Sequence, residues 1–420
     1  MAHILFVDSN VPGIDAMRRA LSAGHRVTLI TSTDYRMYPD NAETAAVLAA
    51  VHRSRRIEMA SDVAALTATV RAVLAEEPVD AVITQNEFCV EATALMAREL
   101  GLPFTDTDAV VTARHKGRTR DRLAAAGLAS ARYAVSSTVS EAVGAAEAIG
   151  LPVIVKPPSG ADSILAFRAD TPAEVADAAR RVLDEVKRLP RLMHDQFTRG
   201  VLVEQYLIGD LVSAELGAGN GRFYRFMLSG RPRAIANECV EMGAFMPADV
   251  TPATADRCFA YAEEVCRALG LDLGIFHIEL MVTADGPVLV EANPRLMGGV
   301  MPSLYQHVTG VNIHDSLLRI HLGQPVEEPL PVATSCVTTR KLMPLRAGRL
   351  ADEIPLEWLD QYDDRVIAFD PYRLTPGAQV AELEILARYQ VRGADLAEAS
   401  READTLLGLF EKSVGVPLIR

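Results

Sequence analysis

The chain has 420 residues and little that would suit a polyanionic partner or a membrane. Its 42 basic and 55 acidic residues give a net charge of −13, so nucleic acid and anionic lipid are poor candidate partners. No apolar run approaches the roughly 18 residues of a membrane span, and the first residues lack a basic segment followed by a long apolar stretch. We therefore expect a cytoplasmic protein that has no membrane partner. The sequence is also compatible with a homodimer.

Cysteine is scarce as well. The five cysteines form an odd number, without a Cys-x-x-Cys pair or a histidine at zinc-site spacing. This favours reduced thiols over disulfides or zinc. We interpret all five as structural, and they are Cys89, Cys239, Cys258, Cys266 and Cys336.

Two glycine-rich signatures of nucleotide binding are missing. The Gly-x-Gly-x-x-Gly fingerprint does not follow the first apolar strand, where residues 8–13 read Asp-Ser-Asn-Val-Pro-Gly. A nicotinamide or flavin cofactor is therefore not supported. The P-loop pattern Gly-x-x-x-x-Gly-Lys-[Ser/Thr] is also absent.

The periodicity of the chain indicates an α/β protein. Strands are predicted at 4–7, 27–31 and 81–84, and helices at 14–21, 63–75 and 90–100. This alternation is typical of a parallel sheet with helices on both sides, so the first hundred residues look Rossmann-like. Beyond about residue 326 a proline-rich linker leads to a strand-rich segment that extends to about residue 390.

A predicted hairpin at 275–293 carries most of the chemistry. Two strands with period 2 meet at an Asp-Gly turn at 285–286. Polar side chains share a face on each strand: His277 and Glu279 on the first, and Glu291, Asn293 and Arg295 on the second. Hydrophobic side chains are expected on the opposite faces, at Ile278, Leu280, Val282, Val288 and Val290.

The polar side of this hairpin suits a metal and a developing negative charge. Two carboxylates and an amide oxygen suit Mg²⁺, which takes a few protein ligands together with nucleotide phosphates. The arginine suits a charge that forms during a reaction, and Gly298 and Gly299 leave backbone N–H groups for an anion. A surface hairpin with a solvated charged face is the alternative.

Other residues suit a nucleotide. Lys156 ends an apolar strand before a small-residue loop and can supply charge to a phosphate, although it could simply end that strand at the surface. After a second apolar strand, Glu204 can accept from the amino group of adenine while the following backbone pairs with the edge of the base. Asp210 lies a short step beyond and suits a ribose hydroxyl.

The order of these parts resembles the ATP-grasp superfamily of carboxylate ligases. The strongest element is Glu279 followed by the Glu-x-Asn-Pro-Arg motif at residues 291–295. The resemblance implies a Rossmann-like domain at 1–106 and an ATP-grasp fold of α+β type at 107–325, with a small lid subdomain at about 130–207. A small strand-rich domain would follow at 326–420.

The resemblance also implies roles for single residues. ATP would be held by Lys116 and Lys156 at the phosphates, Ser163 in the loop, Glu204 with the backbone of Tyr206 and Leu207 at adenine, and Asp210 at the ribose. Glu279, Glu291 and Asn293 would bind Mg²⁺, as two ions, with Mn²⁺ as an alternative. Arg295 would hold the carboxylate and its acyl phosphate. ATP would be split to ADP and phosphate, and a small-molecule amine would attack the acyl phosphate.

Within the superfamily, the ending Arg-x-x-Gly-Gly resembles the L-amino acid ligases, which make dipeptides. Gly298 and Gly299 then belong to the substrate site, and Glu241 matches the position that binds the amino group of the substrate. A solvent-facing glutamate before a turn is equally compatible with Glu241. Where this group often has a histidine, the chain has Ala244, so the acid can differ from an amino acid.

Three alternatives stay open. A biotin-carboxylase type of enzyme would follow Arg295 with a glutamine and a glutamate, which are absent here. A purine-pathway ligase would need a basic pocket for ribose phosphate, and no basic cluster follows Arg295. A non-catalytic nucleotide sensor would have lost the metal ligands, which this chain retains.

Overall fold

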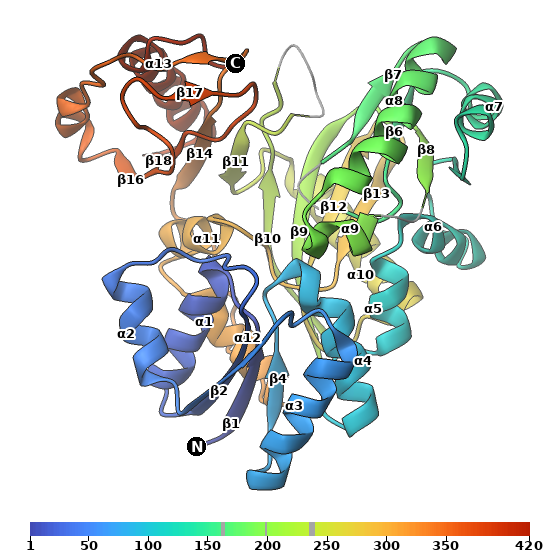
Figure 1. Ribbon diagram of the computed structural model, residues 1–420, viewed down its shortest axis with the longest axis vertical. Helices are drawn as coiled ribbons and strands as arrows, with labels where there is room; N and C mark the ends of the chain where they lie inside the picture. Colours follow the sequence, from blue (N-terminus) through green and yellow to red (C-terminus); the bar gives the residue numbers. More distant parts are fainter. Residues whose placement is uncertain (161–163, 198–199, 235–239) are drawn as a thin grey trace. The chain divides into compact units, whose positions relative to one another are not determined.

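The computed structural model describes residues 1–160, 164–197, 200–234 and 240–420, and these form two compact units (Figure 1). Unit 1 comprises 1–226, 252–302 and 312–330. Unit 2 comprises 227–251, 303–311 and 331–420. In the part of the chain that the structure describes, no helix is long and apolar enough to cross a membrane.

Unit 1 begins with a four-stranded parallel sheet in the order β3-β2-β1-β4. The strands are β1 His3–Val7, β2 Arg26–Ser32, β3 Arg53–Ile57 and β4 Ala81–Ile83. The helices that alternate with them are α1 Val11–Ser22, α2 Ala42–Ala50, α3 Val63–Glu76 and α4 Val90–Leu100, and the short 3₁₀ helix η1 Glu87–Cys89 precedes α4. This is the Rossmann-like α/β arrangement that the periodicity predicts.

A second, antiparallel sheet follows in the order β5-β8-β6-β7. Its strands are β5 Tyr133–Ser136, β6 Val153–Lys156, β7 Phe167–Ala169 and β8 Val201–Gln205. Helices α5 Thr107–Ala113 and α6 Lys116–Ala125 precede it, and α7 Val139–Ile149 and α8 Pro172–Glu185 pack against it (Figure 1). The 3₁₀ helix η2 Val186–Arg188 and helix α9 Arg191–Phe197 complete this part.

Along β6 and β8, the central strands of this sheet, side chains alternate between a face in the hydrophobic core and a second face. Val155 and Val203 are opposite one another and fully buried in the core formed with α7 and α8. Ile154 and Glu204 are also opposite one another, and their side chains point to the other face. Lys156 shares that second face.

The predicted hairpin is present. Strand β12 Gly274–Thr283 lies between β13 Gly286–Asn293 and β9 Asp210–Gly219, antiparallel to both. Strand β10 Arg222–Gly230 follows β9 along the chain. Helix α10 Pro252–Leu269 packs on this sheet, and α12 Ile313–His321 contacts both β12 and α1.

One expectation for the hairpin was wrong. The register shifts between Glu279 and Leu280, which leaves Val290 as the extra residue of a β-bulge. Val288 therefore lies opposite Met281, on the side of Glu279, and is only partly buried. The buried position is Leu289, opposite Leu280, because the bulge reverses the alternation on β13.

Unit 2 contains an antiparallel run of strands in the order β11-β14-β18-β16. Helix α13 Leu396–Val414 packs on β14 and β18, and its apolar face forms the core with Tyr389 and Val391. The strands are β11 Gly243–Met246, β14 Cys336–Leu342, β16 Val366–Pro371, β18 Ala387–Gly393 and the short pair β15 Gly348–Arg349 and β17 Gln379–Val380. The remaining elements are α11 Met301–Thr309 and the 3₁₀ helix η3 Glu357–Tyr362.

Candidate active site

The acidic residues of the hairpin face one another across the strands. Glu279 pairs with Glu291 in the register, and His277 pairs with Asn293. The side chains of Glu279 and Glu291 retain 16% and 20% of their exposure, so both carboxylates are accessible. Among the described residues, no three His, Cys, Asp or Glu side chains form a metal cage. Two carboxylates and one amide oxygen fit Mg²⁺, because Mg²⁺ takes few protein ligands and completes its shell with phosphates and water.

Lys116 lies beside this acidic pair. It is the first residue of α6, it is 8% exposed, and its Nζ is 2.7 Å from Oε1 of Glu291. Its backbone N–H donates to the carbonyl of Pro158, in the segment that follows β6. Burial lowers the pKa of the ammonium, although the charge of Glu291 opposes that shift. The predicted phosphate lysine and metal carboxylate are therefore neighbours.

Lys156 and Glu204 form a second charged group with Arg120. Nζ of Lys156 lies 2.8 Å from one carboxylate oxygen of Glu204, and Nε of Arg120 donates to the other oxygen at 2.7 Å. Burial of the Glu204 carboxyl, the largest influence, acts to raise its pKa. The charges of Arg120 and Lys156 outweigh burial, so the pKa falls to about 2. Both carboxylate oxygens of Glu204 are thus engaged by cations, and contact with adenine stays a prediction.

Arg120 connects this group to the bulged strand. The guanidinium is 1% exposed, and its Nη2 donates to the carbonyl of Val290 at 2.8 Å. Val290 is the extra residue of the bulge, and its carbonyl meets a side chain from α6. A single buried arginine therefore bridges β8 and β13. No motif in the sequence indicates this role for Arg120.

The segment from β8 to β9 passes close to β12. A Cβ at Gly209 would lie 2.2 Å from the carbonyl oxygen of Val282, so only glycine fits there. Asp210 then pairs with Val282 at the start of β9. The ring of Tyr206 lies 4.5 Å from the guanidinium carbon of Arg168. Leu207 lies in the same connection, whereas Ser163 is outside the described residues.

Arg295 lies two residues after the end of β13 and meets a residue of the 3₁₀ helix η1. Its Nε contacts a carboxylate oxygen of Glu87, and its Nη1 donates to the carbonyl of Leu296 at 2.9 Å. Glu87 also pairs with Arg114, which is 5% exposed. Sequence reasoning missed Glu87. The available signal was its place just after the carboxyl end of β4, where ligands of open α/β sheets commonly bind.

The two glycines after Arg295 differ in how strictly glycine is required. A Cβ at Gly298 would lie 3.4 Å from Nη1 of Arg295, an ordinary van der Waals distance, so a small side chain would fit there. Gly299 has a φ of 58°, a left-handed conformation that favours glycine. The place of both glycines in the substrate site stays a prediction.

Glu241 belongs to unit 2, and its Oε2 lies 2.5 Å from Nη1 of Arg231. Its side chain is 20% exposed, so it is neither fully solvated nor buried. Ala244 lies on β11 opposite Thr339. The predicted contact of Glu241 with an amino group stays a prediction.

The cysteines show no bonded pair among the described residues. Four of them are buried free thiols: Cys89, Cys258, Cys266 and Cys336. The fifth, Cys239, lies outside the described residues. Burial raises the pKa of the Cys89 thiol well above its usual value.

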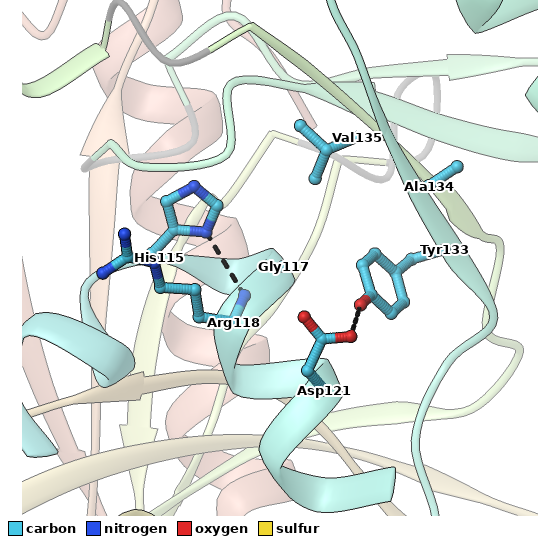
Figure 2. A pocket seen from close by; sticks show the side chains of 7 residues that line it. All are labelled: His115, Gly117, Arg118, Asp121, Tyr133, Ala134 and Val135. Atoms are coloured by element: carbon cyan, nitrogen blue, oxygen red, sulfur yellow. Dashed lines mark hydrogen bonds between the residues drawn. The ribbon is translucent and has the colours of Figure 1, made fainter.

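A pocket of about 400 Å³ opens between α6 and β5 (Figure 2). The hydroxyl of Tyr133 donates to Asp121 across it, and the backbone N–H of Arg118 donates to Nδ1 of His115 at 3.3 Å. A second pocket of about 630 Å³ shares His115 and Arg118. None of the predicted ATP, metal or substrate residues lines either pocket, so we assign the candidate site by its charged groups instead.

Comparison with known families identifies the fold. Residues 149–303 match the model of the ATP-grasp domain, and residues 17–104 match that of the ATP-grasp N-terminal domain. The two matches together cover more than half of the chain. The chain belongs to the ATP-grasp superfamily. The family resemblance and the fold class are thereby confirmed, and ATP-grasp enzymes in general use ATP and Mg²⁺.

The relatives that this ATP-grasp protein matches include a ligase and a formyltransferase. Alanine–anticapsin ligase of Bacillus subtilis (strain 168) is 26% identical over 259 residues, 57% of this chain and 53% of that protein. Formate-dependent phosphoribosylglycinamide formyltransferase of Thermococcus kodakarensis is 25% identical over 351 residues, 82% of this chain and 72% of that protein.

A solved structure shows the same fold. The L-amino acid ligase from Bacillus licheniformis gives a TM-score of 0.79 at 20% identity, over 99% of this chain and 98% of that chain. The chain spans about half or less of the length of most of the curated relatives that it matches.

Proposed function

We propose that this ATP-grasp protein is an ADP-forming carboxylate–amine ligase. One arrangement carries the proposal: two opposed carboxylates, Glu279 and Glu291, on a hairpin whose second strand leads directly to Arg295. Metal ligands and an arginine on one short segment suit a reaction in which a carboxylate attacks the γ-phosphorus of ATP. That attack brings two anions together, so positive charge is needed where they meet.

Each charged group has a proposed task. Lys116 and Lys156 contact phosphates, Glu204 holds Lys156 in position through their 2.8 Å ion pair, and Asp210 binds the ribose. Glu279, Glu291 and Asn293 hold Mg²⁺, as two ions, which when bound neutralises phosphate charge. Adenine lies against the backbone of Tyr206 and Leu207, with Glu204 beside it, and Ser163 belongs to the loop over the phosphates.

Arg295 binds the carboxylate before the reaction and the acyl phosphate after it. The γ-phosphoryl group moves from ATP to a carboxylate oxygen, and ADP leaves. The amine then attacks the acyl carbon, the bond between that carbon and the phosphate oxygen breaks, phosphate leaves with the proton that the amine loses, and an amide forms. Gly298 and Gly299 offer backbone N–H groups to the oxygen that becomes negative during this attack.

The substrates that we propose are amino-acid-like. The names of two relatives, alanine–anticapsin ligase and L-amino acid ligase, support this class. Glu241 is the proposed partner of the amino group of the substrate. Its pairing with Arg231 means that the ammonium group must compete with a guanidinium for this carboxylate.

The test measures ADP and phosphate release with ATP, Mg²⁺ and a matrix of carboxylic acids against amines, including all pairs of amino acids. Release that needs both partners and is lost in Arg295→Ala supports the proposal. AMP as the product would contradict it. Arg19→Ala is the matched control, because Arg19 pairs with Asp315 on an exposed part of unit 1 and its loss should change nothing.

A second candidate is favoured by one observation. The formyltransferase of Thermococcus kodakarensis matches 82% of this chain, more than the anticapsin ligase does. The matrix therefore includes formate as the acid and a phosphoribosyl amine as the acceptor. If only formate and the phosphoribosyl amine reacted, the acid substrate would be formate instead of an amino acid. The reaction would still proceed through an acyl phosphate.

A further inference from the structure

One buried carboxylate next to the hairpin of β12 and β13, here called the metal hairpin, has no part in the proposed reaction. Glu215 lies on β9, opposite His277 of β12, and is fully buried. A buried carboxylate is costly unless its oxygens are paired, so its partners indicate why it is there. Both of its oxygens are engaged, and both partners belong to the segment that carries the proposed site.

The first oxygen of Glu215 contacts Nδ1 of His277. A carboxylate oxygen accepts a hydrogen bond from a ring N–H, so this contact holds the imidazole in one orientation. The other ring nitrogen, Nε2, lies 3.3 Å from Oε1 of Glu279. The imidazole is 3% exposed and therefore has little freedom to turn away. Glu215 thus orients a ring that contacts one of the proposed metal ligands.

The second oxygen of Glu215 accepts from the backbone N–H of Met297 at 3.2 Å. Met297 lies between Arg295 and Gly298, the residues proposed to hold the acyl phosphate. The same loop is held a second time, because the backbone N–H of His277 donates to the carbonyl of Arg295 at 3.0 Å. Glu215 and His277 therefore fix the loop on both sides of Leu296.

We propose that Glu215 is a positioning residue that sets the metal ligand Glu279, through His277, and the acyl-phosphate loop, through Met297. The inference rests on the proposed function and deepens it, because one buried carboxylate then aligns the metal with the arginine that holds the acyl phosphate. Groups behind metal ligands commonly contribute 10- to 100-fold to metal affinity or activity. Glu215 touches neither substrate nor metal in this assignment.

The test compares Mn²⁺ affinity in the presence of ADP, followed by the Mn²⁺ electron paramagnetic resonance signal, between wild type and Glu215→Gln. Glutamine retains the shape of the side chain but loses the charge. We expect Mn²⁺ binding to weaken by about 10- to 100-fold and kcat to fall by a similar factor, with the KM for ATP changed less than twofold. Glu215→Asp, which retains the charge, should recover part of both losses.

A matched control is available in the same unit. Asp15 pairs with Nδ1 of the fully buried His314 at 3.0 Å, between α1 and α12. Asp15→Asn breaks the same type of pair far from the metal hairpin in sequence, and should leave Mn²⁺ affinity and kcat unchanged. Equal losses in both variants would indicate general destabilisation and overturn the inference.

Other outcomes separate the inference from the proposed function. If wild type itself binds no Mn²⁺ with ADP, the proposed nucleotide site fails. If wild type binds and Glu215→Gln binds equally well with unchanged kcat, the positioning role fails. If Glu215→Gln does not fold, Glu215→Asp is tested in its place. The carboxylate of that variant is one methylene shorter, so unchanged Mn²⁺ affinity would overturn the positioning role.

Discussion

The ammonium of Lys116 lies 2.7 Å from a carboxylate oxygen of Glu291, and both groups belong to the proposed Mg-ATP site. A cationic side chain beside a proposed metal ligand has two expected consequences. It supplies charge for a phosphate, and it neutralises the carboxylate when no metal is bound. The same ammonium therefore competes with a divalent cation in the absence of nucleotide and supports it in the presence of nucleotide.

Replacing Lys116 with alanine should affect the two ligands in opposite directions. We expect the KM for ATP to rise by about tenfold, which corresponds to about 1.4 kcal/mol for a lost phosphate contact. Mn²⁺ affinity without nucleotide should rise, because Glu291 loses its competing partner. Titration with Mn²⁺ alone and steady-state kinetics measure the two effects.

Lys156→Ala is the control for that experiment. Lys156 pairs with Glu204 rather than with a proposed metal ligand. Its loss should therefore raise the KM for ATP and leave Mn²⁺ affinity without nucleotide unchanged. If Lys116→Ala weakened Mn²⁺ binding in the absence of nucleotide, competition between Lys116 and the metal would be refuted.

Arg295 and Arg114 share one carboxylate, which allows a matched comparison. Both pair with Glu87, but only Arg295 is proposed to touch the reacting groups. Arg295→Ala should lower kcat by about 100- to 1,000-fold, the usual cost of losing a group that stabilises transition-state charge. The KM for ATP should change little.

Arg114→Ala should act mainly on stability. Its side chain is only 3% exposed, and its removal leaves Glu87 with one cation fewer. Truncating one partner of a buried ion pair costs about 3–5 kcal/mol, so the melting temperature should fall clearly. Equal losses of kcat in the two variants at matched folded fractions would remove the special role of Arg295.

Glu241 tests the substrate class. If its carboxylate binds the amino group of the substrate, Glu241→Gln should raise the KM for an amino-acid substrate by at least about tenfold, or about 1.4 kcal/mol. The KM for ATP should stay the same. An otherwise identical acid without the amino group serves as the control, and its KM should not respond to the substitution. If the KM values for both acids rose, Glu241 would act by stabilising unit 2 through its ion pair with Arg231 and not by binding the amino group.

The sequence predicts elements well where one period dominates. The helix at 90–100 is found at the predicted residues, and the hairpin strands form as expected. Strand β3, with the sequence Arg-Ser-Arg-Arg-Ile, was not predicted because its only apolar residue leaves no alternation to detect. Helix α13 was also missed, although it supplies much of the core of unit 2.

The site shows a different limit. The residues proposed to bind metal and phosphate could be singled out because they lie in short motifs whose order resembles a known family, and their roles stay predictions. Glu87, Arg120 and Glu215 lie outside those motifs, and each meets its partner from a distant part of the chain. No local pattern encodes such contacts. The bulge at Val290 was equally hidden, because one extra residue on a strand leaves no mark in composition.

Glu204 links the candidate site to the stability of the fold. Its folded pKa is about 2, against 4.5 for an ordinary glutamate, because Arg120 and Lys156 outweigh the effect of burial. A carboxyl with a lowered folded pKa stabilises the native state fully above its unfolded pKa. That stabilisation is lost as the pH falls from 4.5 towards 2, since the unfolded state then binds the proton first. The shift corresponds to about 3 kcal/mol.

Glu204→Gln should therefore lower the free energy of unfolding at pH 7 and flatten its decline in acid. Urea unfolding at pH 7, 4.5 and 3 measures both effects, and the difference between wild type and variant should shrink as the pH falls. Glu263→Gln is the control, because Glu263 pairs with Arg225 and Arg267 at the surface, where such pairs contribute at most about 1 kcal/mol. A difference that is the same at all three pH values would mean that Glu204 acts through packing, and that its ion pairs with Arg120 and Lys156 add nothing to stability.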